Sequence, residues 1–158
     1  MFNLGILASQ IATPATPPLS VPNCVWWNDA SDTSSITGAS LASAIANKSG
    51  SGGSLTQGTT SNQPATNSRT QNSLNVLDFD GTNDYMTATL SAIANDPLIT
   101  VFMVVKYDVL SNNHVPFSQG AMSSVNGYGL GYNNTRGVYN AFFYGAENID
   151  SSVTPSTN

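Results

Sequence analysis

The stretch at residues 77–106 constrains the fold more than any other part of this sequence. Apolar and acidic side chains alternate at 77–80, as they do in a strand with one buried face. The turn-forming sequence Gly-Thr-Asn-Asp occupies 81–84, and the chain resumes at 85–86. Residues 100–106 carry apolar side chains on both faces, which is typical of a strand in the middle of a sandwich. The stretch therefore predicts a strand, a turn, a second strand and a buried core strand, and with them an all-β fold.

Composition narrows the classes of protein that fit. The chain has 158 residues, which suits one domain, and 40% hydrophobic content is enough for a core. Sixty residues are Ser, Thr, Asn or Gln, while only 8% are charged, so we expect a neutral surface rich in hydroxyls and amides. The net charge is −5 and the four cations are far apart in sequence. No basic patch is predicted, which argues against nucleic acid as a partner.

Short strands separated by polar loops are predicted along the rest of the chain. A strand at 24–27 should run into an Asx-rich turn at 28–32, with the single cysteine, Cys24, as a small buried residue. Residues 38–46 are compatible with one helical turn or with a strand of small residues, and residues 47–54 form a flexible loop. Later strands are expected at 99–108, 115–118, 127–132 and 138–144.

Glycines alternate with large residues at 127–132, so large side chains share one face of that strand and glycines the other. Something must pack closely against the glycine face, either an opposing sheet or a ligand.

Residues 1–22 are predicted to form an arm that precedes the domain at 23–158. Five apolar residues near the start need cover, and four prolines between 13 and 22 favour an extended spacer. We interpret the apolar residues as an anchor that docks on another protein. The stretch has no basic residue and is too short to span a bilayer. The anchoring residues are Phe2, Leu4, Ile6, Leu7 and Ile11.

An ordered set of short motifs resembles one superfamily. The motifs are Trp-Asn-Asp-Ala-Ser-Asp at 27–32, Asn-Lys-Ser-Gly at 47–50, Gln-Pro at 63–64, Phe-Asp-Gly-Thr-Asn-Asp-Tyr at 79–85 and the strand at 100–106. Together they are similar to concanavalin A-like lectins and glucanases, and more narrowly to the laminin-G-like domains of bacteriophage structural proteins and bacterial surface proteins. The similarity extends from about Val25 to Tyr144.

The resemblance implies an antiparallel two-sheet jelly-roll sandwich preceded by the extended arm. The chain departs from the family pattern in two ways. Family members commonly carry a tryptophan two residues before an Asp-Lys-Ser-Gly turn, where this chain has Ile45 and Asn47. They also continue for several strands beyond the point that corresponds to Asn158, so further strands are expected from a longer chain or from a partner.

Catalysis is not predicted, although the superfamily includes enzymes. Its glucanases use glutamates on one strand, and glycoside hydrolysis needs two carboxylates. Glu147 is the single glutamate in the sequence. The lone histidine, His114, is predicted to lie solvated in a loop, without the partners of a triad or a metal cluster.

Calcium is the cofactor that the resemblance raises. Asp80, Asn83 and Asp84 offer hard oxygen ligands, as do Asp29 and Asp32. Because these residues lack the repeated spacing of a dedicated calcium loop, we interpret them as turn and capping groups. No cofactor and no metal is therefore predicted.

Glycan binding is the remaining candidate for a specific site. The loop between two predicted strands presents Tyr132, Asn133, Asn134 and Arg136, an aromatic ring beside hydrogen-bonding groups. The favoured hypothesis is a non-enzymatic virion protein of a bacteriophage, a fibre, tail or capsid-decoration component. It would dock on other virion proteins by its arm, form a homo-oligomer, and display a sandwich for adhesion to host glycans. The alternative is a secreted or cell-surface carbohydrate-binding module.

Overall fold

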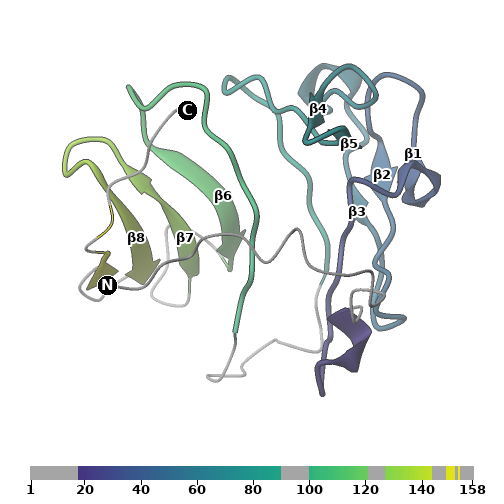
Figure 1. Cartoon of the computed structure of the whole chain (residues 1–158), viewed down its shortest axis with the longest axis horizontal. Helices are drawn as coiled ribbons and strands as arrows, with labels where there is room; N and C mark the ends of the chain where they lie inside the picture. Colours follow the sequence, from purple (N-terminus) through teal and green to yellow (C-terminus); the bar gives the residue numbers. More distant parts are fainter. Residues whose placement is uncertain (1–17, 90–99, 121–126, 144–148, 152, 154–158) are drawn as a thin grey trace. The chain divides into compact units, whose positions relative to one another are not determined.

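The computed structural model describes residues 18–89, 100–120, 127–143, 149–151 and 153. Its strands are all antiparallel and form three sheets, and its helices are three short 3-10 turns (Figure 1). The described chain is therefore mostly β, which confirms the predicted all-β class. Two compact units divide the chain, the first at residues 1–99 and the second at 100–158. The anchoring arm at 1–17 lies outside the described residues.

The first unit contains a small sheet with the strand order β1-β2-β3. Ile36, Ile45 and Leu55 are register partners across it, so three branched side chains lie side by side. Ile45 is only 2% exposed and is one of the core residues. For residues 38–46 the sequence allowed a helical turn or a strand, and the structure has a short strand at 44–45. The strands are β1 (Ile36–Thr37), β2 (Ala44–Ile45) and β3 (Leu55–Thr56).

A second hairpin in this unit lies in a stretch too polar to be predicted as strands. Strands β4 (Thr70–Gln71) and β5 (Leu74–Asn75) pair with each other around a two-residue turn. The turn residues Asn72 and Ser73 both have positive φ, 52° and 64°. This conformation is that of a type I′ turn, whose twist matches the twist of the two strands.

The core of the first unit is partly polar. Two glutamines are buried, and their amides are hydrogen-bonded to backbone oxygens: Gln63 Nε2 donates to Gln57 O at 2.7 Å, and Gln57 Nε2 donates to Tyr85 O at 3.0 Å. These bonds tie the buried chain near β3 to the chain after the acidic turn. Buried amides that find such partners fix one arrangement of the chain, because leaving them unpaired costs about 1–3 kcal/mol each.

The strand–turn–strand prediction for residues 77–86 is correct only for its turn. Asp80 Oδ1 accepts hydrogen bonds from the backbone N–H groups of Thr82 and Asn83, at 2.8 and 3.2 Å. The two arms do not pair with each other. Asp78 instead bridges to Ala65, and Thr87 bridges to Thr56. The physical reason is that backbone groups elsewhere in the unit, distant in sequence, provide the partners of both arms.

The second unit is built on a four-stranded meander with the order β6-β7-β8-β9. Three of these strands fall where the sequence predicts them, at 115–118, 127–132 and 138–144. The strands β6, β7 and β8 lie side by side in Figure 1. Their bounds are β6 (His114–Gln119), β7 (Tyr128–Asn133), β8 (Val138–Phe143) and β9 (Ile149–Asp150).

The glycine face of β7 is covered by the neighbouring strand. A Cβ atom on Gly129 would collide with the ring of Phe142, which belongs to β8, and one on Gly131 would meet the backbone oxygen of His114. At Gly129, the close approach that the sequence predicts is made by a ring on the adjacent strand.

The prediction of a buried core strand at residues 100–106 is wrong for this structure. The segment is extended in Figure 1 but forms no strand and makes no backbone hydrogen bond within the described residues. Phe102 is 86% exposed and Val104 is fully exposed. The pattern of apolar residues shows that the segment needs cover on both faces, but it contains no information about which segment provides that cover.

Candidate functional site

A densely hydrogen-bonded polar cluster begins in the Asx-rich turn at 28–32, where two consecutive Asp-x-Ser motifs, at 29–31 and 32–34, close tight turns. Asp29 Oδ1 accepts from Ser31 N and Ser31 Oγ, at 3.1 and 2.6 Å. Asp32 Oδ1 accepts from Ser34 N and Ser34 Oγ, at 3.2 and 2.5 Å, and Asp32 caps the 3-10 helix η2 (Thr33–Ser35). Short side chains with an oxygen acceptor are what such turns require.

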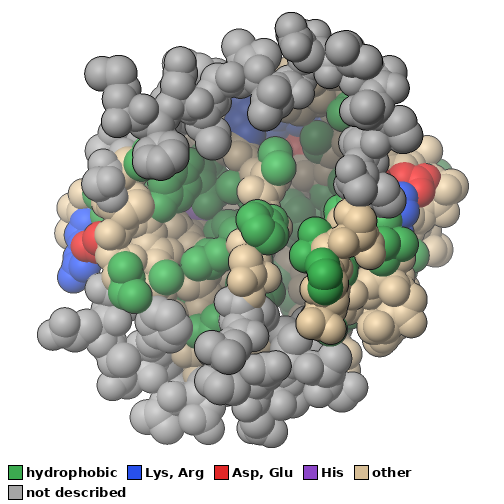
Figure 2. Space-filling model, turned by 60° about the horizontal axis from the view of Figure 1, so that its bottom comes forward, with side chains coloured by type: hydrophobic (Ala, Val, Ile, Leu, Met, Phe, Trp, Pro, Cys, Tyr) green, Lys and Arg blue, Asp and Glu red, His purple; other side chains and the backbone are tan. Residues whose placement is uncertain are grey.

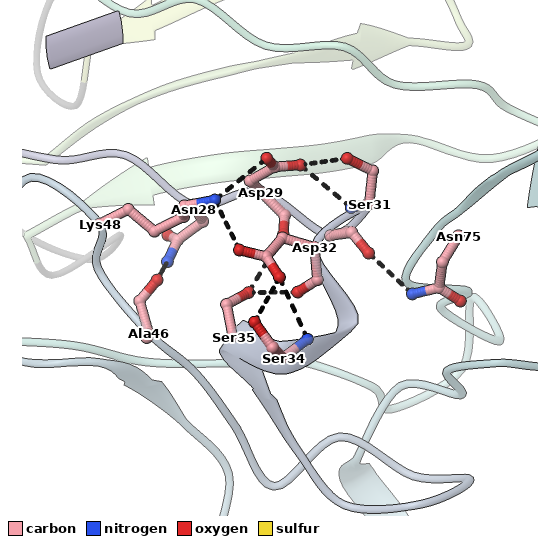
Figure 3. Close-up of polar contacts among 10 residues, drawn as sticks. Asn28, Asp29, Ser31, Asp32, Ser34, Ser35, Ala46, Lys48 and Asn75 are labelled. Carbon is pink, nitrogen blue, oxygen red and sulfur yellow. Dashed lines mark hydrogen bonds and ion pairs between the residues drawn. The ribbon is translucent and has the colours of Figure 1, made fainter. Parts of the chain in front are cut away.

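Lys48 joins the two carboxylates. Its Nζ lies 2.7 Å from Asp32 Oδ2 and 3.4 Å from Asp29 Oδ2, and Figure 3 shows the ammonium group between the two side chains. The same Nζ lies 4.6 Å from the ring centroid of Trp27, a cation–π distance. The ammonium group therefore takes the place that a metal cation would need between Asp29 and Asp32.

The electrostatics of the cluster favour the ionised forms. The Lys48 ammonium group, followed by the Ser34 hydroxyl, lowers the pKa of Asp32 to about 2. The pKa of Asp29 is lowered chiefly by its hydrogen bond from the Ser31 hydroxyl, and that of Lys48 is raised chiefly by Asp32. A general acid at neutral pH needs a raised carboxyl pKa, so these carboxylates are suited to holding charge in place.

Backbone and amide contacts fasten this turn to the rest of the unit. Trp27 N donates to Asn47 Oδ1 at 3.0 Å, and Lys48 N donates to Trp27 O at 2.7 Å. Asn28 Nδ2 donates to Ala46 O at 2.8 Å. These bonds explain why the predicted strand at 24–27 does not form: its backbone is paired with the loop after β2, not with a neighbouring strand.

The far side of the turn is held by one amide. Asn75 Nδ2 donates to Ala30 O at 2.7 Å and to Thr66 Oγ1 at 3.2 Å. Because Thr66 is almost completely buried, this amide connects the surface turn to the core and to strand β5.

The second set of candidate metal ligands is also engaged in turn contacts. Asp84 Oδ2 accepts from Asp80 N at 2.9 Å, and Asn83 Nδ2 donates to Ser61 O and to Asn62 Oδ1, both at 2.9 Å. Backbone N–H groups, first that of Thr82, lower the pKa of Asp80. These contacts support the interpretation of the three residues as turn groups.

An open pocket of about 340 Å³ lies beside this turn. The residues that line it include Asp78, Asp80, Asp84, Thr60 and Ser61. Asp78 is ion-paired with Arg69 at 3.1 Å. Within the described residues, no group of three or more His, Cys, Asp and Glu side chains has the geometry to hold a metal ion.

The residues predicted to bind glycan come together at the turn between β7 and β8, but they are not equivalent. Tyr132 is only 6% exposed, which argues against a sugar stacking on its ring. Asn133 Oδ1 accepts from Arg136 N at 3.1 Å, and Asn134 Nδ2 donates to Ser111 O at 2.8 Å. Arg136 is half exposed and pairs with Asp150. Of the four predicted residues, Asn134 and Arg136 are exposed, Asn133 is partly exposed and Tyr132 is buried.

Tyr132 belongs to an aromatic cluster that the sequence did not predict. His114, Tyr132 and Tyr139 are successive register partners on β6, β7 and β8. The ring of Tyr107 stacks on His114 with 4.7 Å between centroids and lies 6.2 Å from the rings of Tyr132 and Tyr139. Burial, and then the charge of Tyr139, raise the pKa of Tyr107 to about 12.

His114 corrects a second expectation. It was predicted to lie solvated in a loop, but it begins strand β6, and its Nε2 is buried without a hydrogen-bond partner among the described residues. Its position directly before the strand predicted at 115–118 is the signal that could have placed it on that strand. The ring packs in the aromatic cluster because its register partner on β7 is Tyr132.

Charged side chains in the described part of the chain occur mainly as pairs. Figure 2 shows blue and red groups in contact beside broad tan and green surfaces.

Among the described residues, no helix is long and apolar enough to cross a membrane. Comparison of the chain with models of protein families, with curated proteins and with solved structures found no match.

Proposed function

We propose that this chain is a non-enzymatic structural protein of a bacteriophage particle, a fibre, tail or capsid-decoration component. An N-terminal arm would dock it on other virion proteins and would display a lectin-like sandwich outward. The proposal rests on the structural roles of the acidic residues in the motifs. The carboxylates of Asp29, Asp32 and Asp78 are ion-paired, and that of Asp80 holds a turn. Residues that resemble a family motif thus serve as a scaffold.

The proposed sandwich is supported by the faces of the β6–β9 sheet. Because register partners share a face, Phe117, Leu130 and Ala141 lie on the same side as Tyr132 and its aromatic neighbours. A sheet with one apolar face needs a second layer on it. Tyr107 packs on this face, as a residue of the opposite layer would.

Protein composition of purified particles tests the virion assignment. Particles from a host that carries this sequence would be purified, digested with trypsin and analysed by mass spectrometry. The four cations define the useful peptides, among them residues 49–69 and 107–136. We expect both peptides at a stoichiometry that stays fixed through repeated purification. Their loss during purification, or their absence from the particles, would refute the assignment.

Deletion of residues 1–22 tests the arm. The shortened chain should keep the circular dichroism spectrum of the full chain but fail to enter particles. A matched control replaces only the prolines at 17, 18 and 22 with alanine, which leaves the apolar residues in place. Incorporation of the deleted chain at the level of the full chain would overturn the role of the arm.

A carbohydrate-binding module at a cell surface is the second candidate. It is favoured by the exposed positions of Asn134 and Arg136 on a turn between two well-paired strands, since binding residues are commonly presented on such loops. Binding to a glycan array by the wild-type chain should be lost in an Asn134→Ala, Arg136→Ala double variant and kept in an Arg69→Ala control. Absence of any bound glycan would remove this candidate.

A further inference from the structure

The 100–106 segment, residues Thr-Val-Phe-Met-Val-Val-Lys, is an apolar run that pairs with no strand among the described residues of the second unit. It contains no proline and no glycine, and its one charge lies at its end. Strand-forming segments of this length and composition pair readily with identical segments. Its backbone makes no hydrogen bond within the described residues, so its N–H and C=O groups are open to a partner.

The two faces of the segment differ in their surroundings. Tyr107 continues the odd-numbered face and packs on the aromatic residues of β6, β7 and β8. Met103 and Val105, on the same face, are less exposed than their neighbours. The even-numbered face presents Phe102 and Val104, the two most exposed large apolar side chains of the described chain. Two large apolar side chains on this face are therefore in contact with water.

The sequence of the segment is complementary to itself in an antiparallel pair. With Met103 of two copies opposite each other, Phe102 lies opposite Val104, and Val101 lies opposite Val105. The same register places each Lys106 opposite a threonine and at the far end from the other lysine. An aromatic residue opposite a β-branched residue stabilises such a pair, whereas opposed like charges would destabilise it.

We propose that the 100–106 segment is an interaction surface for a second copy of this chain, and that two copies pair antiparallel about Met103 with a two-fold axis. Such an interface is isologous and closed. A pair of seven-residue strands buries at most roughly 1,000 Å², the low end for specific interfaces. The dimer should therefore dissociate on dilution.

Sedimentation velocity of the full chain over a dilution series tests the pairing. The wild-type mass should rise with concentration from 16.5 kDa to twice that value. Val104→Lys should stay at the lower mass over the whole series, and the control Val153→Lys, at another exposed valine, should follow the wild type. A wild type that is monomeric throughout, or that grows beyond two copies, would overturn the proposal. The proposal would also be overturned if Val104→Lys had the same mass as the wild type at every concentration but was less stable. That result would mean that the segment is covered by its own chain.

Disulfide cross-linking tests the register. In a Cys24→Ser background, Met103→Cys places two thiols directly opposite each other, where Cα atoms in an antiparallel pair are about 4.5–5.5 Å apart and a disulfide can close. Val104→Cys, which lies opposite Phe102, is the matched control. We expect a covalent dimer from Met103→Cys within minutes of mild oxidation and at least tenfold less from Val104→Cys. Equal yields from the two variants, or none from Met103→Cys, would contradict the register.

Discussion

Replacing Gly129 by alanine should destabilise the second unit, because the new methyl group has no room. It would collide with the ring of Phe142, and it would lie 2.7 Å from the backbone oxygen of Phe117. Overpacking of this kind typically costs about 1–3 kcal/mol. Since one of the two obstacles is backbone, we expect the upper half of that range, about 2–3 kcal/mol of unfolding free energy. Urea unfolding followed by circular dichroism measures it.

A double-variant cycle measures how much of the loss in unfolding free energy comes from the collision with the Phe142 ring. In a Phe142→Ala background, Gly129→Ala should cost about 1 kcal/mol less than in the wild type, a coupling within the usual range for residues in contact. Gly131→Ala is the matched control, because its methyl group would meet the backbone oxygen of His114 and only touch the ring. Its cost should be equal in both backgrounds. A tolerated Gly129→Ala, or equal costs for it in both backgrounds, would refute the packing of Phe142 over β7.

Three further predictions concern single groups. Because the pKa of Asp32 in the folded chain is about 2, below the roughly 3.9 of an unfolded chain, its stabilising contribution is complete above that higher value. The contribution is lost as pH falls toward 2, so the urea midpoint should fall in acid, and less steeply in Lys48→Met. Asn75→Ala removes the bonds to Ala30 and Thr66; it should lower the unfolding free energy by about 1–3 kcal/mol, whereas Gln71→Ala in the same hairpin should change it by less than about 0.5 kcal/mol. His114→Phe removes a buried nitrogen that has no hydrogen-bond partner among the described residues; it should leave the thermal midpoint equal or higher, and a marked drop would show that the nitrogen is bonded.

The sequence predicted correctly those elements that are formed by residues close to one another in the chain. The alternation in β7 and β8, with turn residues between them, was enough to predict both strands, because a hairpin is formed by residues close in sequence. The Asx-rich turn at 28–32 was predicted for the same reason: each aspartate bonds the serine two residues on.

Partners distant in sequence could not be predicted. Lys48 reaches carboxylates 16 and 19 residues away, and no spacing in the sequence marks it as their partner. The same holds for the exposed 100–106 segment. Its apolar pattern predicted that the segment is buried, but it could not predict which other segment would cover it. The β4–β5 hairpin was missed for another reason: its strand residues are polar apart from Leu74, and its pairing depends on two turn residues with positive φ.

We propose that the acidic motif residues hold loops in place and have no catalytic role. Titration of the Asp29 and Asp32 carboxyl carbons by NMR tests it most directly, because a scaffold and a general acid require opposite shifts. We predict a pKa of about 2 for Asp32 and a lowered pKa for Asp29, with that of Asp32 moving back toward the ordinary value of 3.8 in Lys48→Met. A carboxyl group in this pair that titrates above its ordinary value in the wild-type chain would contradict the account.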